Sequence, residues 1–107
     1  MTLRPPLGNA RQVPATALDY EIAQEQASVL GRLGRSLEAA LAALAEHDAV
    51  EASDKGARRQ LVQQASEALW CFIVQREACG LRDPRPVLRG YAVPGEVYAR
   101  MGARRSG

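Results

Sequence analysis

The residues of this chain that most often perform chemistry in proteins are few and widely spaced. His47 is its one histidine, and its two cysteines, Cys71 and Cys79, lie eight positions apart in a stretch of helical character. Eight residues span about 12 Å along a helix, too far for a disulfide between the two thiols. These three residues also match no zinc-binding spacing. The sequence therefore predicts no metal, no cofactor and an inert Cys71 in the core.

A pair of carboxylates can act as general acid and base, and Glu77 with Asp83 is the best candidate for such a pair. Arg76 and Arg82 lie among them, so four charges surround the predicted end of a helix. No histidine is close in the sequence, and the pattern does not favour catalysis. We predict that the chain is not an enzyme.

Arg76 is the charged residue in the most unusual place, because helical spacing puts it on the apolar stripe of its segment. A partly buried guanidinium needs carboxylate or carbonyl partners, since an unpaired buried charge is costly. Two interpretations stay open: a structural brace to acids of the preceding helix, which is favoured, and an anion-binding site. The residues of this candidate site are Arg76, Glu77, Arg82, Asp83, Asp19 and Glu25.

Two helical segments must position these residues, and their apolar spacing predicts a long antiparallel hairpin. The first runs from about residue 17 to 46 behind a Thr16 cap, with a near-heptad seam typical of coiled coils. The second runs from about 54 to 79, begins at Ser53 or Asp54 and ends before Gly80. Because the connection is short, the helices are antiparallel neighbours, which places Arg76 near Glu25.

Gly31 and Gly34 interrupt the first predicted helix, and each costs up to about 1 kcal/mol relative to alanine. Two interpretations stay open for these glycines. They are either tolerated weaknesses, or they permit the close approach of another helix.

The rest of the chain completes one domain over residues 14–102. Residues 1–13 have no periodicity and are predicted to be a flexible leader. Two prolines in 81–86 predict an extended linker, and a short helix is expected over about 94–101 before Gly102. A frayed tail over 103–107 follows. The predicted fold class is all-α.

The segment from Ala68 to Val74 is apolar on every face, which predicts burial on every side. Trp70 points away from the first helix, so the C-terminal segment or a second copy must cover it. Much of the remaining apolar content is alanine, which buries little area, and we predict a homodimer with a four-helix bundle core. The expected packing and interface residues are Trp70, Val74, Phe72, Tyr91, Val97 and Met101.

Charge is divided along the chain. Residues 1–53 carry four arginines against seven acids, and residues 54–107 carry one lysine and nine arginines against five acids. Opposite signs favour arms that attract each other, or antiparallel self-assembly. Six arginines follow Gly80, but no recognition helix or dense basic run accompanies them. A nucleic-acid-associated protein that uses this Arg-rich segment is therefore the alternative to a non-enzymatic homo-oligomeric interaction or scaffold module.

Location follows from the cysteines and the apolar runs. Unpaired cysteines and the lack of a signal peptide indicate the cytoplasm. The longest apolar run, Ala68 to Val74, is too short to cross a bilayer, so no membrane association is predicted.

Five short motifs resemble an uncharacterised bacterial family of small helical proteins, a domain of unknown function. They are Trp70, Gln75-Arg76-Glu77, Gly80-Leu81-Arg82-Asp83, Val93-Pro94 and Arg100-Met101-Gly102. The resemblance covers about residues 16–102. It implies a helical fold and a bacterial origin, and it brings no activity and no functional residue.

Overall fold

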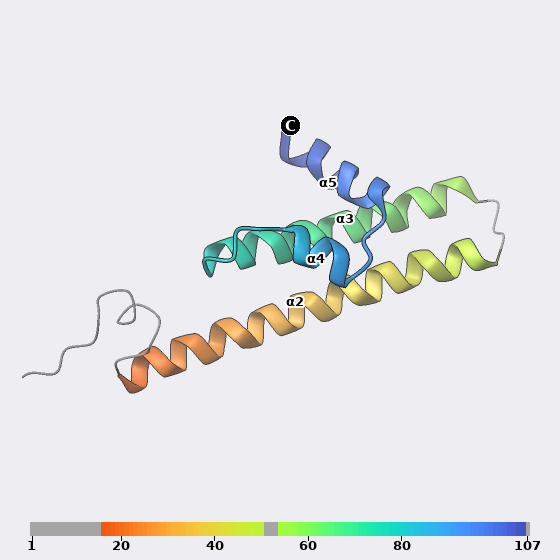
Figure 1. Cartoon of the computed structure of the whole chain (residues 1–107). Coiled ribbons are helices and arrows are strands. Elements are labelled where there is room, and N and C mark those ends of the chain that lie inside the picture. The colour runs from red at the N-terminus through yellow and green to blue at the C-terminus, as the bar shows by residue number, and fades with distance from the viewer. Residues whose placement is uncertain (1–15, 51–53, 107) are drawn as a thin grey trace, which may run out of the picture.

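Four helices follow one another in the computed structural model, which describes residues 16–50 and 54–106 (Figure 1). They are α2 (Ala17–Ala49), α3 (Lys55–Ala78), α4 (Arg85–Gly90) and α5 (Gly95–Ser106), and the described residues contain no strand. The predicted all-α fold, with a long antiparallel hairpin and a C-terminal helix, is confirmed. The predicted leader over residues 1–13 lies outside the described residues.

Side chains and a glycine fix the ends of the two hairpin helices. The Thr16 hydroxyl accepts a hydrogen bond from the Asp19 N–H in the first turn of α2 at 3.1 Å, and the Asp54 carboxylate accepts one from the Ala57 N–H in the first turn of α3 at 3.0 Å. At the other end of α3, Gly80 has a φ of 91°, and the Leu81 N–H donates to the Arg76 carbonyl at 2.8 Å. A glycine in this left-handed backbone conformation commonly ends a helix, so the predicted end of the helix before Gly80 is confirmed.

The register of the hairpin differs by about one turn from the prediction. A Cβ on Gly34 would stand 3.5 Å from the ring of Phe72, so these two residues lie opposite each other. Arg76, one turn further along α3, is therefore opposite Leu30 rather than Glu25. The reason is that α2 continues to Ala49, three residues past its predicted end, which moves the connection along the chain.

The predicted extended linker contains a helix that sequence reasoning missed. Pro84 precedes α4 and Pro86 lies in its first turn, where a helix needs no N–H donor. The helix ends like α3, with the Val93 N–H donating to the Leu88 carbonyl at 2.9 Å. Ala92 has a φ of 51° there, a left-handed position that glycine usually occupies.

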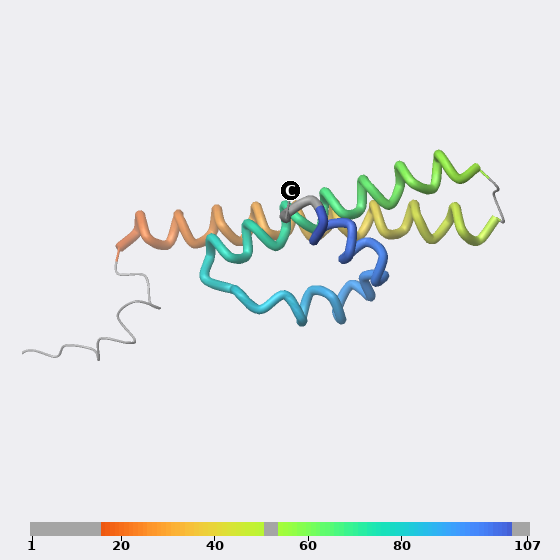
Figure 2. Tube along the Cα trace, turned by 90° about the horizontal axis from the view of Figure 1, so that it is seen from above, coloured from red at the N-terminus to blue at the C-terminus, as the bar shows by residue number. Residues whose placement is uncertain are grey.

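The predicted frayed tail is also wrong in part, because α5 continues through Gly102 to Ser106. Glycine within a helix costs about 1 kcal/mol relative to alanine, which weakens a helix without ending it. Seen from above, the C-terminal segment lies along one side of the hairpin (Figure 2). It is thus part of the fold.

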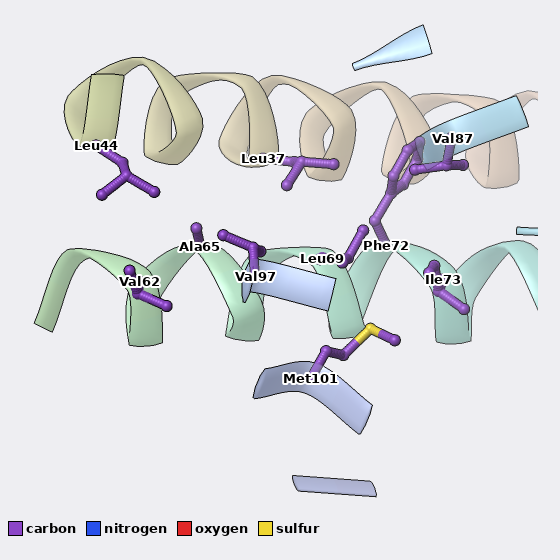
Figure 3. Packing of buried hydrophobic residues seen from close by; sticks show 10 residues of the cluster. All are labelled: Leu37, Leu44, Val62, Ala65, Leu69, Phe72, Ile73, Val87, Val97 and Met101. Carbon is purple, nitrogen blue, oxygen red and sulfur yellow. The ribbon is translucent and has the colours of Figure 1, made fainter. Parts of the chain in front are cut away.

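The core lies where α2, α3 and α5 meet (Figure 3). Leu37 and Leu69 are fully buried there, and α5 contributes Val97 and Met101, which are 0% and 2% exposed. Trp70 packs half-buried against this cluster. Among the residues that the structure describes, the buried hydrophobic ones are Leu37, Leu44, Val62, Ala65, Leu69, Phe72, Ile73, Val87, Val97 and Met101.

Burial of the segment from Ala68 to Val74 on every side is not observed. Cys71 is exposed and Val74 is 38% exposed, so the prediction of a core Cys71 is wrong. The helices α2 and α5 cover two faces of α3, and Cys71 and Val74 lie on the face that points away from both. Of the other predicted packing residues, Phe72 is buried and Tyr91 is half-buried.

Candidate interaction surface

Arg76 is half-buried at the end of α3, as expected, but its neighbours differ from the predicted acids. One guanidinium nitrogen donates to the Asp83 carbonyl at 3.2 Å, and the guanidinium carbon lies 6.0 Å from the centre of the Phe72 ring. A carbonyl and an aromatic face are both suitable neighbours for a guanidinium. Arg76 therefore holds the chain that follows α3 against the hairpin, and it does not brace α2.

The remaining members of the predicted polar set are dispersed. Glu25 is exposed, and Asp19 lies eleven residues before Leu30, about 16 Å along α2 from the level of Arg76. Asp83 instead accepts hydrogen bonds from Arg85 at 3.0 Å, which lower the pKa of its carboxyl to about 2. Glu77 is half-buried and Arg82 exposed. The structure unites only Arg76 and Asp83 from this set.

A polar cluster that sequence reasoning missed joins three helices. Arg58 of α3 donates to the Asp48 carboxylate of α2 through Nε at 2.8 Å and Nη2 at 3.2 Å. The same guanidinium donates to the Glu96 carboxylate of α5 through Nη1 at 3.0 Å and Nη2 at 2.6 Å. Two-pronged contacts of this kind are among the stronger hydrogen bonds in proteins. Arg58 therefore fastens the closed end of the hairpin to the start of α5.

The electrostatics of this cluster keep all three groups ionised. The hydrogen bonds from Arg58 lower the pKa of the Asp48 and Glu96 carboxyls below their ordinary values, and those carboxylates raise the pKa of Arg58. A carboxyl with a lowered pKa stays ionised at neutral pH and is a poor general acid. The cluster is suited to holding helices together.

A groove of about 570 Å³ opens beside this cluster, between the second half of α2 and the turn that leads into α5. Glu38, Asp48 and Glu96 contribute carboxylates to its lining, and Arg58 is the one cation among the lining residues. Because two carboxylates already hold that guanidinium, the groove offers an anion little attraction.

The most exposed apolar residues of α2 lie at the opposite end of the hairpin. Every residue from 17 to 28 is exposed, and Leu18, Tyr20 and Ile22 are 62%, 60% and 49% exposed. In both views the start of α2 extends past the end of α3 (Figures 1 and 2). We call residues 17–28 the projecting part of α2. It is a helical surface with apolar side chains directed toward solvent.

One family model matches residues 2–107, nearly the whole chain, and it describes a family of unknown function, DUF6665. The chain belongs to this family. Membership agrees with the resemblance drawn from Trp70 and the motifs after it. No curated protein and no solved structure matches the chain.

Nothing in the described part of this DUF6665 member brings metal ligands together or offers a bilayer span. Residues 16–50 and 54–106 contain no group of three or more histidine, cysteine, aspartate or glutamate side chains placed to hold a metal ion. Over the same ranges, no helix combines the length and the apolar character needed to cross a membrane. The projecting part of α2, which exposes Leu18, Tyr20 and Ile22, is a candidate contact surface.

Replacing Arg58 with alanine should lower the melting temperature at pH 7 by more than the control Arg85→Ala, whose pair with Asp83 is local. Asp48 and Glu96 have lower pKa values when folded, so the native state binds fewer protons than the unfolded chain. The stabilisation by Arg58 is thus complete above about pH 4–5 and is lost as the pH falls through the lowered values. Thermal melts from pH 7 to 3 should show the melting temperatures of the wild type and of Arg58→Ala converging. A constant difference down to pH 3 would contradict this assignment.

Proposed function

We propose that this chain is a non-enzymatic, homo-oligomeric protein-interaction module, a small scaffold whose contact surface is the projecting part of α2. The observation that carries the proposal is the exposure of Leu18 and Ile22 on a helix that continues past its only neighbour in the hairpin. The proposed setting is the bacterial cytoplasm.

Helical physics supports this assignment. Twelve residues of helix are marginally stable in water by themselves, and here they rely on continuity with the packed part of α2. Burying an exposed leucine or isoleucine stabilises a complex by up to about 1.5–3 kcal/mol before ordering costs. An amphipathic helix that offers such residues is a common mode of protein recognition.

The alternative of a nucleic-acid-associated protein draws less support from the arginines after α3. Arg85 is held by Asp83, and Arg100 donates to the Gln63 side chain at 2.6 Å. Phosphate binding would have to compete with these contacts. Nucleic-acid binding by the Arg-rich segment therefore remains the alternative function, and its composition is the one feature that supports it.

Sedimentation velocity at micromolar concentration should show a dimer or larger species of the full chain. Leu18→Glu with Ile22→Glu should convert it to a folded monomer, because the charges oppose burial of this surface. Tyr98→Glu is the matched control, since Tyr98 is 43% exposed but lies on α5. A monomeric wild-type chain, or a double variant that assembles like the wild type, would refute the proposal.

A further inference from the structure

A charged stripe runs beside the apolar residues of the projecting part. At 100° per residue, Leu18, Ile22, Val29 and Leu33 fall within 60° of one another around α2. Four exposed charged residues lie in the adjoining arc of 80°. They are Glu21, Glu25, Arg32 and Arg35. The sign of this stripe changes once, close to Ser28.

Interactions within α2 do not account for this change of sign. The helix dipole acts on the first and last turns, whereas Arg32 and Arg35 lie in the middle of α2. Glu25 and Arg32 are seven residues apart, about 10 Å along the helix, and do not form an i to i+4 pair. The Arg32 guanidinium donates to the Ser28 hydroxyl at 3.1 Å instead. The acidic half and the basic half of the stripe would therefore each attract the opposite half of a second, reversed stripe.

We propose that two copies of the chain pair antiparallel along this part of α2, around a twofold axis near Ser28. This inference rests on the proposed function and specifies its partner and geometry. An antiparallel pair about this axis places Glu25 opposite Arg32 of the partner subunit and Glu21 opposite Arg35 of the partner subunit. Each attraction occurs twice, because a twofold interface repeats every contact. A parallel pair would instead set like charges against like charges, which is unfavourable.

The apolar stripe fits the same arrangement. With the axis near Ser28, Ile22 lies close to Leu33 of the partner subunit, and Val29 lies beside the axis. The exposed Ile22 of one copy thereby packs against the half-buried Leu33 of the partner subunit, in the part of α2 that is paired with α3. This register also lets the two helices overlap for about 20 residues, or roughly 30 Å.

Charge reversal separates this geometry from other modes of assembly. Two double variants, Glu21→Arg with Glu25→Arg and Arg32→Glu with Arg35→Glu, each set like charges against each other in the antiparallel pair. Each should raise the dimer dissociation constant about tenfold or more at low salt. The variant with all four substitutions restores opposite charges and should dimerise within about threefold of the wild type. Circular dichroism should show that all three variants are folded.

Two results would overturn the antiparallel pair while leaving the interaction module in place. One is that the wild type dimerises and both double variants have the same dimer dissociation constant as the wild type. The other is a folded four-substitution variant that remains monomeric. A monomeric wild-type chain would instead remove the proposed function itself, so the two failures are distinguishable.

Discussion

Truncation after Arg89 is expected to lower the free energy of unfolding by several kcal/mol and to shift the emission of Trp70 to the red. The deletion removes Val97 and Met101, which are almost fully buried and contribute about 1.5–3 kcal/mol each before ordering costs. It also removes Glu96 and thereby one of the two partners of Arg58. Trp70 packs against the core cluster that these residues complete, so water should reach its indole. Urea unfolding followed by fluorescence measures both effects.

A second truncation, after Gly102, is the control, because it leaves Val97 and Met101 in place. It should change neither stability nor emission clearly. If the shorter chain does not fold at all, Val97→Ala and Met101→Ala test the same contacts. Met101→Ala should cost about 2–5 kcal/mol, and Val97→Ala should cost less because it removes fewer carbon atoms. Wild-type stability in these two variants would mean that α5 does not contribute to the core.

Gly34→Ala should destabilise the protein by about 1–3 kcal/mol in spite of alanine's better helix propensity. A Cβ on Gly34 would stand 2.6 Å from the Tyr91 hydroxyl oxygen, closer than the two atoms can approach. Tyr91 cannot move freely, since its ring packs edge-on against Phe72 with centroids 5.7 Å apart. The close approach that Gly34 permits is therefore made by the tyrosine of the C-terminal segment and by Phe72.

A double-mutant cycle tests this explanation. Tyr91→Phe removes the clashing oxygen, so Gly34→Ala should cost clearly less in that background. Gly31→Ala is the matched control, because its Cβ would meet only the Arg35 guanidinium, at 3.4 Å. That change should be neutral or stabilise by up to about 1 kcal/mol. Equal costs of Gly34→Ala with and without the Tyr91 hydroxyl would refute the steric argument.

The sequence predicted those features of the fold that depend on local signals. Thr16, Asp54 and Gly80 end or begin helices through their own side chains or backbone freedom, and the structure has them in these roles. The prediction of an extended linker from the prolines around α4 was wrong, because proline is compatible both with extended backbone and with the first turn of a helix. Propensity alone does not separate these two states.

Features that depend on register were not predictable in the same way. A shift of three residues in the end of α2 was enough to give Arg76 the wrong partners. The role of Arg58 was not predictable, because Asp48 lies past the predicted end of the first helix and Glu96 lies 38 positions from Arg58. Pairs so distant in sequence carry no local pattern, and only the packed helices bring them together.

The two partners of Arg58 have a consequence for the order of folding. Asp48 is ten positions from Arg58 and Glu96 is 38 positions away, so the first contact closes a far shorter loop. We expect the hairpin to form early, with the guanidinium already oriented by Asp48, and α5 to dock later onto this prepared site. An interaction completed after the transition state slows unfolding and leaves the folding rate almost unchanged. The link between Arg58 and Glu96 would then act as a latch, which sets how long a folded molecule lasts.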